Sequence, residues 1–130
     1  MDRQTREFIR QRADNRCEYC GLHQSQAPSL LFHTEHIRAR QHGGDDSADN
    51  GCLACPTCNF KKGPNQSGYD PLTGLLVGLY NPRNDIWSKH FREDDGMVEG
   101  LTTQGRATVA LLDMNRERLV RLRQIVEEDE

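Results

Sequence analysis

Two cysteine pairs enclose the central part of the sequence, Cys17-Glu18-Tyr19-Cys20 and Cys55-Pro56-Thr57-Cys58. Each pair has the C-x2-C spacing, and two such knuckles can wrap four thiolates tetrahedrally around one zinc ion. The 34 residues between the knuckles are more than a plain zinc ribbon carries, so an additional element must be inserted there. Because four thiolates leave no open position for water, we expect a structural zinc on Cys17, Cys20, Cys55 and Cys58.

A fifth cysteine leaves an alternative open, since Cys52-Leu53-Ala54-Cys55 also has the C-x2-C spacing. We prefer Cys55 with Cys58, because Pro56 and a following helix make a natural knuckle. Cys52 is then expected to be a small buried hydrophobe. A disulfide framework explains an odd number of cysteines poorly when no export signal precedes them. Five unmetallated reduced thiols remain the second alternative.

Composition favours one small domain over residues 1–130, with 35% hydrophobic residues and a formal charge of -3. No apolar run approaches the roughly 20 residues that a membrane helix needs, and no apolar segment follows Met1. We therefore expect a soluble, cytoplasmic protein that makes no membrane contact. Residues 127–130 supply four of the negative charges, so net charge neither supports nor excludes a phosphate-bearing partner.

Hydrophobic periodicity and capping residues predict the order of the elements. We expect a basic amphipathic helix over 1–16, strands over 30–40 and 50–53, and a short helix over 56–62. C-terminal helices are expected from Thr102 or Thr103 through Leu112 and after Asn115 as far as Val126. The glycine- and proline-rich residues 64–100 predict short strands or irregular packing. The inserted element is therefore expected to be a hairpin followed by a helix.

Three polar positions between the knuckles resemble a known signature. Glu35-His36-Ile37 precedes the Gly43-Gly44 loop, Asn50 follows His36 by fourteen positions, and Asn59 follows Asn50 by nine. Together with the knuckles, this pattern resembles the HNH, or ββα-metal, endonucleases over residues 17–63.

The resemblance implies an α+β fold. Its zinc-stapled ββα-metal core would span residues 17–63, with an N-terminal helix before it and a C-terminal helical extension over 64–130 packing on it. The implied activity is hydrolysis of DNA phosphodiester bonds that leaves a 5′-phosphate and a 3′-hydroxyl. Glu35 stands where the family more often has Asp or His, and this change lengthens the ligand arm by one methylene.

Phosphodiester hydrolysis requires a base that deprotonates water and a cation that neutralises the negative charge developing on the phosphate and the leaving oxygen. His36 can be the base because its free pKa lies near neutrality. The resemblance implies that Glu35 and Asn59 ligate a divalent ion such as Mg²⁺. It also implies that Asn50 forms hydrogen bonds with the loop backbone and so keeps the His36 ring oriented. In a regular strand Glu35 and His36 face opposite sides, so one site needs a twist or bulge at the strand end.

Basic side chains close in sequence to these site residues predict contact with DNA. We assign Arg38, Lys61 and Lys62 to phosphate binding, although Lys62 could instead bind the last carbonyls of its own helix. One alternative is a zinc-stapled nucleic-acid-binding module with an inactive centre, in which arginines of the first helix contact phosphate. Another is an interaction protein that holds a partner with its C-terminal helices. The sequence leaves the oligomeric state open.

Overall fold

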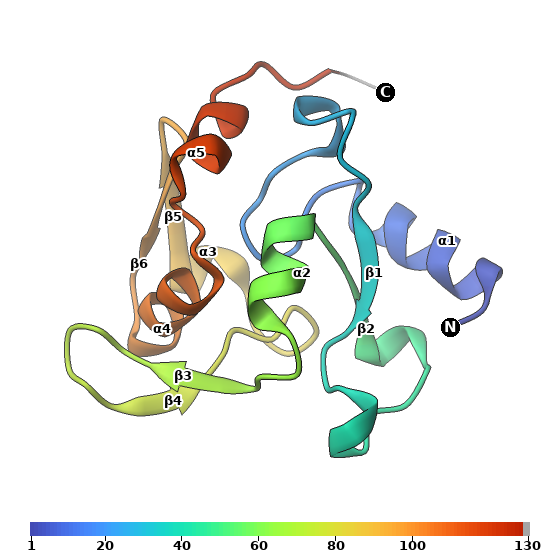
Figure 1. Ribbon diagram of the computed structural model, residues 1–130, viewed down its shortest axis with the longest axis horizontal. Helices are drawn as coiled ribbons and strands as arrows, with labels where there is room; N and C mark the ends of the chain where they lie inside the picture. The colour runs from blue at the N-terminus through green and yellow to red at the C-terminus, as the bar shows by residue number, and fades with distance from the viewer. Residues whose placement is uncertain (129–130) are drawn as a thin grey trace.

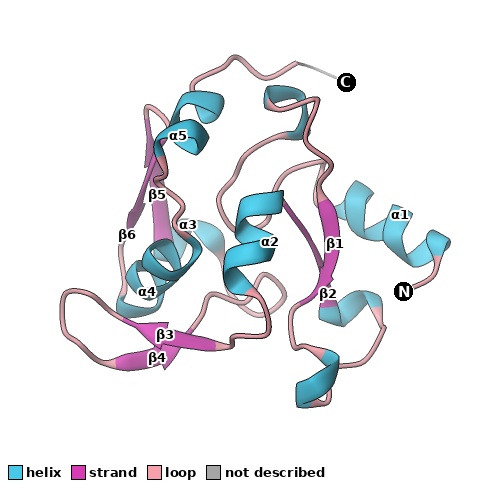
Figure 2. Cartoon of the chain, viewed as in Figure 1, coloured by secondary structure: helices cyan, strands magenta, loops and turns pink. Residues whose placement is uncertain are grey.

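The computed structural model describes residues 1–128 (Figure 1). Short helices and three two-stranded antiparallel sheets alternate along the chain (Figure 2). The elements are α1 (Arg3–Arg12), β1 (His33–His36), β2 (Gly51–Ala54), α2 (Pro56–Lys62), β3 (Ser67–Tyr69), β4 (Leu76–Gly78), α3 (Trp87–His90), β5 (Phe91–Asp94), β6 (Met97–Gly100), α4 (Thr103–Leu112) and α5 (Glu117–Arg123). Single 3₁₀ turns lie at Gln24–Gln26, Arg40–His42 and Ala48–Asn50.

The strand–loop–strand–helix order predicted for the inserted element is present. β1 pairs with β2, and the register sets Glu35 opposite Cys52 and His36 opposite Gly51. Every residue of β2 is buried. The absence of a side chain at Gly51 is required, because a Cβ there would lie 2.4 Å from the Ile9 side chain of α1. The hairpin therefore packs closely beneath the N-terminal helix.

α1 is shorter than the 1–16 expected from the sequence. Asp2 caps its start by accepting a hydrogen bond of 2.8 Å from the Thr5 amide. The helix ends at Arg12 because Asp14 and Asn15 adopt left-handed backbone conformations, with φ of 55° and 56°. Aspartate and asparagine tolerate that region better than most residues, so they stop the helix before the first knuckle.

α2 has the bounds predicted for it and lies between β1 and α4 (Figure 1). Pro56 occupies its first turn, where a missing amide hydrogen costs nothing. The Cys55 sulfur caps the helix by accepting from the Cys58 amide at 3.5 Å. Gly63 ends it with a positive φ of 50°. The helix thus carries both cysteines of the second knuckle at its first turn.

Residues 66–128 contact the first knuckle through polar and aromatic groups. The Trp87 indole donates to the Tyr19 carbonyl at 2.8 Å, and the Tyr19 and Tyr80 rings meet edge to face at 6.4 Å. Arg83 pairs with Glu18. Within the extension, the fully buried Asp70 carboxylate accepts two hydrogen bonds of 2.9 Å from Arg106.

The last helix differs from the sequence expectation at both ends. Asn115 does not cap it, because its side chain accepts from the Val98 amide and donates to the Val98 carbonyl, both at 2.8 Å. α5 instead begins at Glu117 and ends at Arg123, before Val126. Among residues 1–128, no helix combines the length and apolar character needed to cross a membrane.

Candidate metal centre and active site

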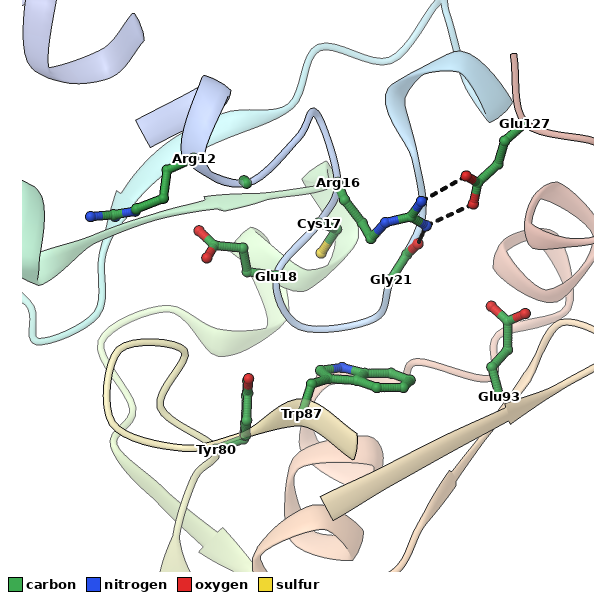
Figure 3. A pocket seen from close by; sticks show the side chains of 10 residues that line it. Arg12, Arg16, Cys17, Glu18, Gly21, Tyr80, Trp87, Glu93 and Glu127 are labelled. Atoms are coloured by element: carbon green, nitrogen blue, oxygen red, sulfur yellow. Dashed lines mark hydrogen bonds and ion pairs between the residues drawn. The ribbon is translucent and has the colours of Figure 1, made fainter. Parts of the chain in front are cut away.

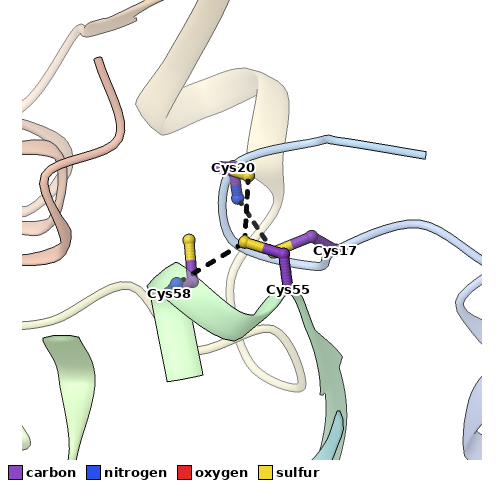
Figure 4. A group of neighbouring side chains, drawn as sticks. All are labelled: Cys17, Cys20, Cys55 and Cys58. Carbon is purple, nitrogen blue, oxygen red and sulfur yellow. Dashed lines mark hydrogen bonds between the residues drawn. The ribbon is translucent and has the colours of Figure 1, made fainter. Parts of the chain in front are cut away.

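The four predicted cysteines form one buried cluster (Figure 4). All four sulfur atoms lie within 4.8 Å of one another, and those of Cys20 and Cys55 are 3.8 Å apart. Sulfurs on a tetrahedral zinc at Zn–S distances of about 2.3 Å would be about 3.8 Å apart, so the cluster fits this ion. The cluster pairs Cys55 with Cys58 rather than with Cys52, which confirms the predicted second knuckle. It is compatible with a zinc-stapled core.

Proton sharing within the cluster favours a bound dication. Hydrogen bonds led by that of Cys17 hold the pKa of the Cys20 thiol well below its usual value. The same network, again led by Cys17, raises the pKa of Cys58. Four thiolates this close together repel one another, so a bound dication would be needed to hold all four in the ionised form.

Cys52 lies beside the cluster and links it to Glu35. Its sulfur is 3.6 Å from the Tyr19 hydroxyl and 3.6 Å from the Glu35 carboxylate. Burial raises the pKa of the Cys52 thiol, so it remains a neutral donor. The expected role of Cys52 as a buried small residue is therefore correct, and it also makes a polar contact with Glu35.

Glu35 is an unusually buried carboxylate, with 9% of its surface exposed. Burial raises its pKa to about 7, and the charge of Lys62 opposes this rise. Lys62 is itself 2% exposed and donates to the Ile37 carbonyl at 2.8 Å. A carboxylate that is half protonated near neutral pH can lose its proton to solvent when it binds a divalent cation. Glu35 is therefore suited to bind such an ion reversibly.

His36 is half-buried and hydrogen-bonded to a carboxylate that lies outside the predicted site residues. Its Nε2 lies 2.7 Å from Asp46, which also pairs with Arg40. Arg40, followed by His36, lowers the pKa of Asp46, so this carboxylate is ionised and can only accept. Nε2 must therefore carry a hydrogen, which leaves Nδ1 of neutral His36 with the lone pair needed by a base.

Asn50 fixes the loop that returns from His36 to β2. Its amide group donates to the carbonyls of Arg38 at 2.9 Å and Asp45 at 2.8 Å, and its oxygen accepts from the Arg38 amide at 2.9 Å. Gly44 makes this closure possible, since a Cβ there would lie 1.7 Å from the Arg38 carbonyl oxygen. The loop that carries Asp46 is thereby held beside β1.

Three of the four predicted catalytic residues line one open hollow of about 550 Å³ at the edge of β1, and the fourth, Asn50, is not among its lining residues. Glu35 and His36 contribute from the strand, and Asn59 contributes from α2. The remaining lining residues are Thr34, Ala39, Arg40, Phe60, Gly63 and Pro64. Glu35 and His36 therefore both line the hollow although they are neighbours on one strand. The Glu35 carboxylate contacts Cys52, whereas the His36 ring contacts Asp46.

The three cations assigned to DNA contact differ in their surroundings. Arg38 is exposed and donates to the His42 carbonyl at 2.6 Å. Lys61 is half-buried in the last turn of α2. Lys62 departs from the expectation, because its ammonium group is buried against the Ile37 carbonyl and faces Glu35. This environment gives Lys62 an internal electrostatic role in place of an exposed phosphate contact.

A second cavity of about 450 Å³ lies between the first knuckle and the extension (Figure 3). Trp87 and Tyr80 border it, and Arg16 closes one side through two hydrogen bonds, of 2.7 and 2.6 Å, to Glu127. Glu127 therefore neutralises the charge of Arg16 at this side of the cavity.

Comparison with protein families agrees with this geometry. Residues 17–65 match the family model described as HNH endonuclease. The match covers both knuckles and the element between them, the part of the sequence that resembles this family. No curated protein and no solved structure matches the chain.

Proposed function

We propose that this protein is an HNH-type endonuclease that hydrolyses DNA phosphodiester bonds with a divalent metal ion and His36 as general base. The observation that carries the proposal is the single hollow in which Glu35, His36 and Asn59 meet, within the matched residues 17–65. A strand histidine beside a carboxylate and an amide oxygen supplies both a base and hard ligands for a cation.

The proposed mechanism assigns one task to each group. Asp46 holds the His36 ring with Nε2 protonated, and Nδ1 takes a proton from the attacking water. Glu35 and Asn59 would hold the divalent ion through oxygen atoms, and Mg²⁺ favours such ligands. When bound, this ion neutralises charge on the phosphate and on the leaving oxygen. The products would be a 5′-phosphate and a 3′-hydroxyl, as in the family that the sequence resembles.

Nicking of supercoiled plasmid with magnesium or manganese tests the proposal. The parent protein should nick, and His36→Ala should lower the rate by roughly 10²- to 10⁴-fold, the usual contribution of a general base. His33→Ala is the matched control, because His33 is an exposed histidine on the same strand that does not line the hollow. Equal loss in both variants would contradict the assignment of the base.

Binding to DNA separates catalysis from recognition. Loss of nicking in His36→Ala with unchanged DNA affinity would support a catalytic role for this side chain. If the parent nicked no DNA with either metal but bound short DNA more weakly as salt rose, the chain would be a nucleic-acid-binding module with an inactive centre.

A further inference from the structure

Phe60 is a large apolar side chain that the core of the protein does not use. It follows Asn59 on α2 and has 81% of its surface exposed, so its burial contributes little to folding. Single exposed apolar residues are common on protein surfaces, and exposure alone carries no meaning. The position of Phe60 is what distinguishes it, because its side chain lines the same hollow as Glu35 and His36.

The surroundings of Phe60 combine an aromatic ring with a nearby cation. Arg40 lines the same hollow, and its side chain is 68% exposed while it pairs with Asp46. Gly63 and Pro64 complete this side of the hollow, and both are exposed. An aromatic face beside a positive charge is the arrangement with which proteins bind a nucleotide of a single strand, the ring taking the base and the cation the phosphate.

We propose that Phe60 is a stacking platform for an unpaired nucleobase next to the scissile phosphate, so that the substrate is single-stranded or locally unpaired DNA. A paired base inside a duplex already has both faces stacked on its neighbours, and a protein ring reaches it only after the base is unstacked. The inference rests on the proposed nuclease function and adds the substrate class to it.

Equilibrium binding tests this role without cleavage. Fluorescence anisotropy with a labelled single-stranded oligonucleotide, in a His36→Ala background, compares Phe60→Ala with Phe60→Trp. We expect the Ala variant to bind roughly 5- to 150-fold more weakly and the Trp variant to bind as tightly as the unaltered ring, because stacking on a base contributes in that range. Tyr69→Ala is the control, since Tyr69 is an aromatic of similar exposure, 68%, outside the hollow.

An abasic substrate identifies the contact itself. Once the cut position is mapped, one nucleotide on each side of it is replaced in turn by an abasic site. At one of the two positions the penalty of Phe60→Ala should disappear, because its stacking partner is already absent. A penalty that persists on both abasic substrates, or a Phe60→Leu variant that binds as well as Phe60→Trp, would overturn the stacking role.

The outcomes separate the inference from the proposed function. If the parent nicks DNA and Phe60→Ala binds and cuts single strands within twofold of it, the stacking role fails and the nuclease assignment remains. If the parent cuts no DNA but Phe60→Ala weakens single-strand binding, the stacking role is supported and the nuclease assignment fails. If the parent binds duplex at least as tightly as the single strand of the same sequence, the preference for unpaired substrate is refuted.

Discussion

Replacing Glu35 with glutamine tests whether the burial of this carboxylate makes the free energy of unfolding depend on pH. Burial raises the pKa of Glu35 from 4.5 to about 7. A raised pKa means that the folded state retains a proton that the unfolded chain has already lost. The retained proton therefore favours the folded state. Its contribution to the free energy of unfolding is fully present below pH 4.5 and is lost as pH rises through about 7. The full loss is about 3 kcal/mol, at 1.36 kcal/mol for each pKa unit.

Urea unfolding followed by the fluorescence of Trp87, the only tryptophan, gives the required free energies. With zinc saturating, the free energy of unfolding of the parent should fall by about 2 kcal/mol between about pH 5.5 and pH 8. Glu35→Gln should not show this fall, because its side chain does not titrate. Glu117→Gln serves as the control, because the Glu117 side chain is 76% exposed. Stability curves for parent and Glu35→Gln that stay parallel over this range would refute the reasoning.

Four further substitutions test the rest of the site and core. Asp46→Ala should lower the nicking rate roughly 10- to 100-fold with little change in DNA affinity, since it frees the His36 ring; an unchanged rate in single-turnover assays would exclude this role. Cys58→Ser should abolish bound zinc and cooperative unfolding, whereas Cys52→Ser should retain the metal, as measured by metal analysis and thermal melts. Leu53→Ala should cost about 2 to 5 kcal/mol in urea unfolding because Leu53 is fully buried, and a smaller loss would indicate that the core relaxes around the cavity.

The fold was predictable where local rules decide it. The C-x2-C spacing defines the second knuckle, and Pro56 and Gly63 define the two ends of α2. These features were predictable because each depends only on neighbouring residues. The ends of α1 and α5 were not predictable in this way. Asp14 turns the chain by adopting a left-handed conformation, and Asn115 binds Val98, which lies 17 residues earlier. The hydrogen bonds between Asn115 and Val98 outweigh capping propensity and leave no local sequence signal. Asp14 and Asn15 tolerate the left-handed conformation that ends α1, but their presence does not require it.

The candidate site was predictable as a set of residues but not as a network. The family-like spacing selects Glu35, His36 and Asn59, and the structure places all three around one hollow. Asp46 gave no usable signal, because an aspartate beside Asp45 in a Gly-Gly loop has the composition of a solvated turn. The burial of Lys62 was equally hidden, since its partner carbonyl lies 25 residues earlier in the chain.

The zinc knuckles and the proposed catalytic centre share the same short segments, which links metal binding at one to geometry at the other. Asn59 follows Cys58 directly on the helix that Cys55 caps, and Tyr19 lies between the two cysteines of the first knuckle. The Tyr19 hydroxyl contacts Cys52, whose sulfur in turn contacts Glu35. A displacement of either knuckle therefore moves one of the two proposed oxygen ligands relative to the other. Side chains that orient metal ligands typically change affinity 10- to 100-fold when they are disturbed, so zinc occupancy should set the affinity of the hollow for its divalent ion.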